Sequence, residues 1–125
     1  MSNINVKKFN KVIISFLDEL LAILPEEKNI KVFKNQLSAV EYVSETKIIK
    51  SFIEYGYPYK THILSKDESF FLKYGNVKVE GDYMSEALQL KRLWETKLSK
   101  ENKEVVWKYF KVLILLAEKY MNHSK

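Results

Sequence analysis

The chain has 125 residues, which fits one folded domain, and its 46% hydrophobic content with only 3 glycines and 2 prolines excludes a disordered or low-complexity protein. The absence of cysteine excludes disulfides, thiolate metal sites and cysteine nucleophiles, and it suits a reducing compartment. The formal net charge is +5, but Arg92 is the one arginine among 21 basic residues, and this excess of lysine is also what a genome of low G+C content would produce.

The first half of the chain shows apolar residues at steps of three and four, which predicts amphipathic helices. The first helix is expected from about Asn5 to Leu24. Pro25 disfavours helical geometry at the residue before it but suits the first position of a helix, so we expect a sharp corner there. The second helix should then begin at Pro25 and end before Ser44.

The middle of the chain contains several start and stop signals for short helices. Thr46 is expected to cap a third helix, and Gly56 is expected to end it. The segment 57–59, Tyr-Pro-Tyr, should form a turn. Residues 65–68, Ser-Lys-Asp-Glu, match a capping box that would open a short helix containing residues 70–72.

The last part of the chain begins with a predicted loop from Gly75 to Asp82, in which residues 77–79 are too short for a convincing strand. A fifth helix is expected over residues 83–98. Ser99 or Asn102 should open the last helix, which is apolar around most of its circumference between residues 105 and 117.

These elements predict a single helical domain over residues 1–125, of the all-α class. The expected architecture is a compact bundle of five to six helices around a central apolar C-terminal helix, because helices that are apolar all round are buried. A homodimer interface on one side of that helix would satisfy the same pattern. The residues proposed for such an interface are Val106, Trp107, Phe110 and Ile114.

No catalytic centre is recognisable, so we expect a protein that is not an enzyme and that needs no cofactor or metal. The only histidines are His62 and His123, and no phosphate-binding glycine loop or metal-binding helix motif is present. The N-terminal residues lack the features of a signal peptide, and the longest apolar run is far shorter than a membrane span. We therefore expect a protein of the cytoplasm without membrane contact.

Lysines recur along the second and the last predicted helices, and they are the candidates for nucleic-acid binding. If both rows faced the same way, they would form a basic strip able to contact phosphates, and the alternative is a set of ordinary solvated helix faces. Tyr55, Tyr57 and Tyr59 could stack on bases, although core or turn packing is the favoured explanation. The lysines are Lys28, Lys31, Lys34, Lys100, Lys103, Lys108 and Lys111.

Four segments, in fixed order, carry a resemblance that spans nearly the whole chain. They are Phe9-Asn10-Lys11 through Phe16-Leu17-Asp18-Glu19-Leu20, Leu24-Pro25-Glu26-Glu27-Lys28, Pro58-Tyr59-Lys60 through Lys66-Asp67-Glu68-Ser69-Phe70-Phe71, and Glu101-Asn102-Lys103 through Trp107-Lys108-Tyr109-Phe110. Together they resemble short, uncharacterised helical proteins encoded by nucleocytoplasmic large DNA viruses, the giant viruses. The resemblance implies a protein made in the host-cell cytoplasm and, in one version, carried in the virion. It transfers no catalytic residue.

Two hypotheses of different class follow. The first is a non-enzymatic viral structural or interaction protein, virion-associated and homodimeric, with other virion proteins as further partners. The second is a protein that binds DNA nonspecifically through the lysine rows.

Overall fold

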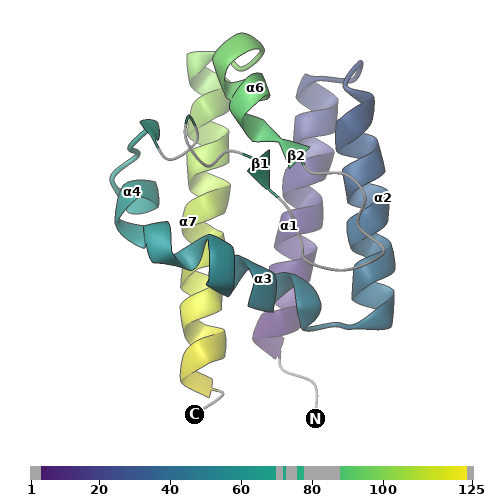
Figure 1. Cartoon of the computed structure of the whole chain (residues 1–125), viewed down its shortest axis with the longest axis vertical. Helices are drawn as coiled ribbons and strands as arrows, with labels where there is room; N and C mark the ends of the chain where they lie inside the picture. Colours follow the sequence, from purple (N-terminus) through teal and green to yellow (C-terminus); the bar gives the residue numbers. More distant parts are fainter. Residues whose placement is uncertain (1–3, 70–71, 73–75, 78–87, 124–125) are drawn as a thin grey trace.

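The computed structural model describes residues 4–69, 72, 76–77 and 88–123. Within these ranges the chain forms helices and one short antiparallel strand pair (Figure 1). The elements are α1 (Ile4–Ile23), α2 (Lys28–Val43), α3 (Lys47–Tyr55), the 3₁₀ turn η1 (Tyr57–Tyr59), α4 (Lys60–Leu64), β1 (Asn76–Val77), β2 (Leu88–Gln89), α6 (Leu90–Thr96) and α7 (Lys100–His123). The predicted all-α class and the compact helical bundle are confirmed.

The long helices α7, α1 and α2 lie side by side, with α1 in the middle and antiparallel to both neighbours (Figure 1). α3 crosses α1 and reaches α7, while α4 packs against α7. The core forms where these helices meet, and its aromatic rings are in edge-to-face contact. Phe9 of α1 meets Phe52 of α3 at 5.3 Å between centroids, and Phe16 meets Phe110 of α7 at 5.7 Å.

α7 is buried on one side and open on the other. Its buried side chains face α1, α3 and α4, whereas Val112 and Leu115 keep 41% and 46% of their surface exposed. The apolar residues around the circumference of α7 therefore lie in two different environments, one buried and one exposed. The buried ones are Val106, Trp107, Phe110, Leu113, Ile114, Leu116 and Ala117.

The corner between α1 and α2 differs from the expectation that Pro25 opens the second helix. α2 begins at Lys28, with Glu27 in extended geometry at the capping position. The backbone N–H of Glu27 donates to the carbonyl of Leu24 at 3.1 Å, so residues 24–27 form a turn with Pro25 at its second position. Proline is favoured there because its fixed φ suits that position.

The capping box predicted at residues 65–68 is not formed. Ser65 donates its hydroxyl to the carbonyl of His62, and Asp67 accepts the backbone N–H of Ser69 at 3.0 Å. The carboxylate of Glu68 instead accepts the indole N–H of Trp94. Of the residues assigned to the helix after this box, 70 and 71 lie outside the described residues.

The fifth predicted helix begins later than expected. Residues 88–89 form β2, which pairs antiparallel with β1, and α6 begins only at Leu90. The expectation for residues 78–87 lies outside the described residues. Of the two residues expected to open the last helix, Ser99 caps α7, because its hydroxyl oxygen accepts the backbone N–H of Asn102 at 3.1 Å.

Candidate docking surface at α4 and α7

The four residues predicted for a dimer interface do not reach the surface, and that prediction is wrong. Val106 and Ile114 are 0% exposed, and Trp107 and Phe110 are 5% exposed. They fill the contact between α7 and the rest of the bundle, because this is the side on which α1 supplies matching apolar residues. A contact of α7 with another molecule must therefore use the opposite side of the helix.

The opposite side of α7 carries two exposed apolar residues among lysines. Val112 and Leu115 are three residues apart, so they lie on the same stretch of helix surface. Lys108, Lys111 and Lys119 are exposed on the same side. We call these five residues, Lys108, Lys111, Val112, Leu115 and Lys119, the outer face of α7.

A hollow between α4 and α7 adjoins this face. Its volume is about 170 Å³, which is room for more than one water-sized group. The apolar floor comes from Ile63 and Trp107, which are almost completely buried, and from Leu64, which is 43% exposed. Lys108 and Lys111 line the hollow and belong to the outer face, so the two features form one continuous surface.

Lys66 is the third lysine of the hollow, and it is held by the end of α4. The N–H groups of Lys66 and Asp67 donate to the carbonyls of Ile63 and His62, which is the Schellman pattern for ending a helix. This pattern requires a left-handed residue, and Lys66 has a φ of 57°. Its ammonium lies 2.7 Å from the carboxylate of Glu104 on α7.

The two cations that remain in the hollow are not neutralised within the described part of the chain. Lys66 is paired with Glu104, whereas no described residue forms an ion pair with Lys108 or Lys111. Positive charge therefore gathers at the rim of an apolar hollow, where it can attract an anionic group from another molecule.

A cluster around Glu118 holds η1 and α4 against α7. The hydroxyl of Tyr57 donates to Glu118 at 2.7 Å, and the ammonium of Lys60 donates to the same carboxylate oxygen. The hydrogen bond from Lys60, and then that from Tyr57, lowers the pKa of Glu118. The carboxylate in turn raises the pKa of the Tyr57 hydroxyl and of Lys60, so all three groups keep their usual neutral-pH protonation states.

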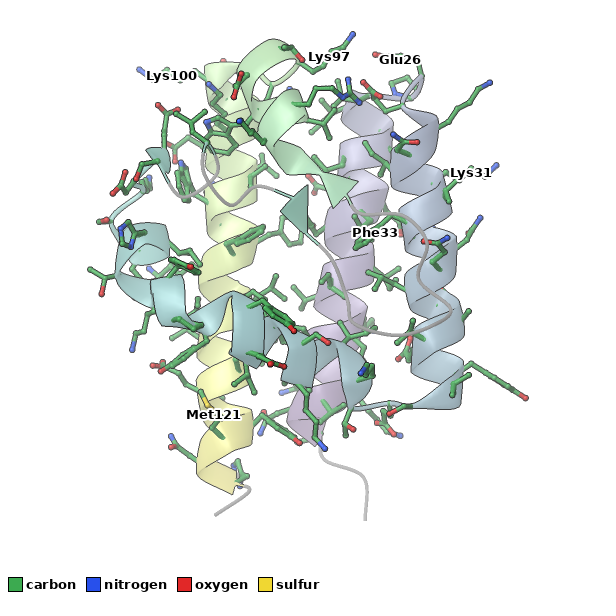
Figure 2. All side chains as sticks on the ribbon, viewed as in Figure 1. Glu26, Lys31, Phe33, Lys97, Lys100 and Met121 are labelled. Carbon is green, nitrogen blue, oxygen red and sulfur yellow. The ribbon has the colours of Figure 1, made fainter. Side chains whose placement is uncertain are left out.

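The lysine rows of α2 and α7 are not brought together, because α1 lies between these helices (Figure 1). In Figure 2, Lys31 points away from α2 on one side of the molecule and Lys100 lies at the start of α7.

Some of these lysines are paired with acidic residues. Lys34 pairs with Asp18 at 2.5 Å. Lys103 lies 3.5 Å from Glu68 and 5.2 Å from the ring centre of Trp94. Lys28 and Lys31 stay exposed, far from the outer face of α7.

The sole arginine is also engaged. Its guanidinium donates to both carboxylate oxygens of Glu27, at 3.2 Å and 2.9 Å, and so joins α6 to the start of α2. The hydrogen bond from Arg92 lowers the pKa of Glu27. Arginine is the residue type best suited to bidentate phosphate recognition, and Arg92 is already engaged in an ion pair within the chain.

The remaining sequence candidates do not assemble into a catalytic centre in the described residues. His62 is half exposed, 3.9 Å from Asp67, and its ring meets Tyr59 at its edge. No group of three His, Asp or Glu residues suited to a metal ion occurs among the described residues. Tyr57 and Tyr59 are partly buried against the core, as core packing would require, while Tyr55 is exposed.

Ile63, Leu64 and Lys66 are the members of the surface that sequence reasoning did not find. They are separated from Lys108 and Lys111 by about forty residues of chain. The only signal in the sequence is that an apolar residue, Leu64, and a cation, Lys66, lie close together in a short segment. This signal does not indicate which helix the two residues face.

Comparison with known proteins adds no relative. The chain matches no protein family model, no curated protein sequence and no solved structure. Across the helices of the described ranges, none is long and apolar enough to cross a membrane. The fold and the surface therefore define a helical-bundle protein with an exposed basic and apolar helix face.

Proposed function

We propose that the protein is a non-enzymatic interaction protein and that it contacts its partner through the outer face of α7 together with the adjoining hollow. The observation that carries this proposal is the exposure of Val112 and Leu115 on a helix whose other side is fully packed. Exposed apolar residues that adjoin one another and are rimmed by polar groups are typical of contact sites. The four resembling sequence segments support a role in a giant virus, as a component made in the host cytoplasm and carried in the virion.

A photo-crosslinking amino acid at position 115 tests the surface directly. In cells that make the protein, Leu115 replaced in this way should give a discrete adduct, because the proposal places it in the contact. The matched control is the same group at Lys31, which is exposed on α2. Equal adducts from both positions, or none from position 115, would contradict the proposed function.

The homodimer expected from the sequence is one form of this proposal. Two antiparallel copies of α7 that meet at Val112 and Leu115 would bring Lys108 near Lys119 of the second copy. Like charges oppose such a contact, and salt screens their repulsion. A homodimer should therefore strengthen as salt is raised, which light-scattering mass at low and high salt measures. A monomer at all salt concentrations would count against it.

Nonspecific DNA binding is the second candidate, favoured by the unneutralised Lys108, Lys111 and Lys119. If these lysines contact three phosphates, the affinity should fall with salt at a logarithmic slope of about −2.7, which is about 40-fold between 50 and 200 mM. A mobility-shift titration with duplex DNA measures this slope. Binding that does not change with salt, or no binding at low salt, would remove the candidate.

A further inference from the structure

We propose that the partner of this surface is an acidic, amphipathic helical segment of another protein, with an apolar side chain that enters the hollow between α4 and α7. This inference rests on the proposed function and names the chemistry of the partner.

The hollow favours an apolar anchor flanked by carboxylates. Ile63, Leu64 and Trp107 give it an apolar floor, and Lys108 and Lys111 stand at its rim without an ion pair among the described residues. An apolar side chain is stabilised by leaving water, at about 25 cal/mol for each Å² that it buries. Carboxylates beside that side chain would meet the two ammonium groups.

The outer face extends this arrangement along α7. Val112 and Leu115 add exposed apolar surface on the side of α7 that carries Lys108 and Lys111, and Lys119 adds a further positive charge there. An amphipathic helix that binds to an apolar surface does so through its own apolar side chains at positions i, i+3, i+4 and i+7. The partner should therefore carry apolar residues three or four positions apart, with Glu or Asp at the edges of the apolar strip.

Two other occupants fit this surface less well. A second copy of the chain would oppose lysine to lysine, as described above. A nucleic acid would meet phosphates with lysine alone, since Arg92 is bonded to Glu27, and Trp107 lies too deep in the floor to stack on a base.

The test measures fluorescence polarisation with a short labelled peptide that forms a helix with paired leucines flanked by glutamates. We expect wild-type protein to bind it, and we expect the double substitution Lys108→Glu with Lys111→Glu to weaken binding about tenfold at low salt. The matched control is Lys28→Glu with Lys31→Glu, which changes the net charge equally on the far helix α2 and should leave the affinity within about twofold. Both pairs are exposed, so circular dichroism melts should stay close to wild type.

Three results would overturn the inference. The first is an equal loss in both double variants, because charge alone would then explain binding. The second is equal affinity for a peptide with glutamines in place of the glutamates. The third is no peptide binding while duplex DNA binds and depends on Lys108 and Lys111. A specific crosslink at position 115 in any of these cases would leave the proposed function standing, whereas its absence would remove that function as well.

Discussion

Lys66 occupies a backbone conformation that most side chains avoid. Its φ of 57° lies in the left-handed region, where a Cβ atom crowds the following carbonyl and costs about 1–2 kcal/mol. Glycine has no such penalty and is the usual residue at this point of a Schellman motif. The lysine at this position places a cation at the hollow at the expense of stability.

Two substitutions of Lys66 separate the cost of its backbone conformation from the contribution of its ion pair. Lys66→Gly and Lys66→Ala both remove the ion pair with Glu104, but only alanine keeps the Cβ atom. We expect Lys66→Gly to be more stable than Lys66→Ala by about 1 kcal/mol, the reverse of their order inside a helix. Urea denaturation of both variants measures this difference. Equal stability would mean that residue 66 is not left-handed in solution.

The Glu118 cluster predicts a pH dependence of folding. The folded-state pKa of Glu118 is lowered from 4.5, first by Lys60 and then by Tyr57. A carboxylate with a depressed pKa contributes stability above its unfolded pKa, and this contribution is lost as the pH falls from about 4.5 through the folded value.

We therefore expect Glu118→Gln to be less stable than wild type at neutral pH and nearly equal to it near pH 2. Thermal melts of both proteins across this range give the comparison. Exposed Glu54→Gln is the control and should change little at any pH, since no ion pair of Glu54 with a described residue is present. A constant difference between wild type and Glu118→Gln at every pH would contradict the assignment.

At the scale of elements, Ser99 and Thr46 form a natural pair for testing helix caps. Ser99 accepts the N–H of Asn102 at the start of α7, whereas Thr46 precedes α3 without a side-chain capping bond. We expect Ser99→Ala to cost about 1 kcal/mol and Thr46→Ala only a few tenths, measured by denaturant titration. If the two substitutions cost the same, the geometry at Ser99 does not act as a cap.

The helices with regular periodicity could be predicted from the sequence, and the short pieces could not. α1 and α3 begin and end within about two residues of their predicted limits, and α7 begins at its predicted start, because apolar spacing and local caps define them. β1 and β2 were missed because each has two residues and is defined by pairing with a distant partner. The start of α6 was misplaced for the same reason.

The candidate surface was predictable only in part. Lys108 and Lys111 were recognised as members of a basic row, because charge is visible in a sequence. The orientation of α7 could not be predicted, because apolar residues occupy most of its circumference. Only packing against the other helices determines that Ile114 is buried while Leu115 is exposed. The hollow itself requires the contact of α4 with α7, which no local pattern encodes.

At the scale of the whole molecule, neighbouring residues of α7 should differ sharply in their effect on folding. Ile114 is 0% exposed and belongs to the hydrophobic core, whereas Leu115 is 46% exposed. We expect Ile114→Ala to lower the free energy of unfolding by about 2–5 kcal/mol and Leu115→Ala to change it by no more than about 0.5 kcal/mol. Urea titrations followed by circular dichroism test this pair, and similar losses for both would mean that α7 is rotated in solution.

The contact between α1 and α7 joins the first and last helices of the described chain, and it is the most extensive contact between helices. During synthesis on the ribosome, α1 emerges long before the helix that covers it. The part of its apolar side that faces α7, where Phe16 meets Phe110, therefore stays uncovered until nearly all the described residues have been translated. A nascent chain that exposes such an apolar surface is a substrate for chaperones. A fragment truncated before α7 would keep this surface exposed and should therefore aggregate and be sensitive to proteases.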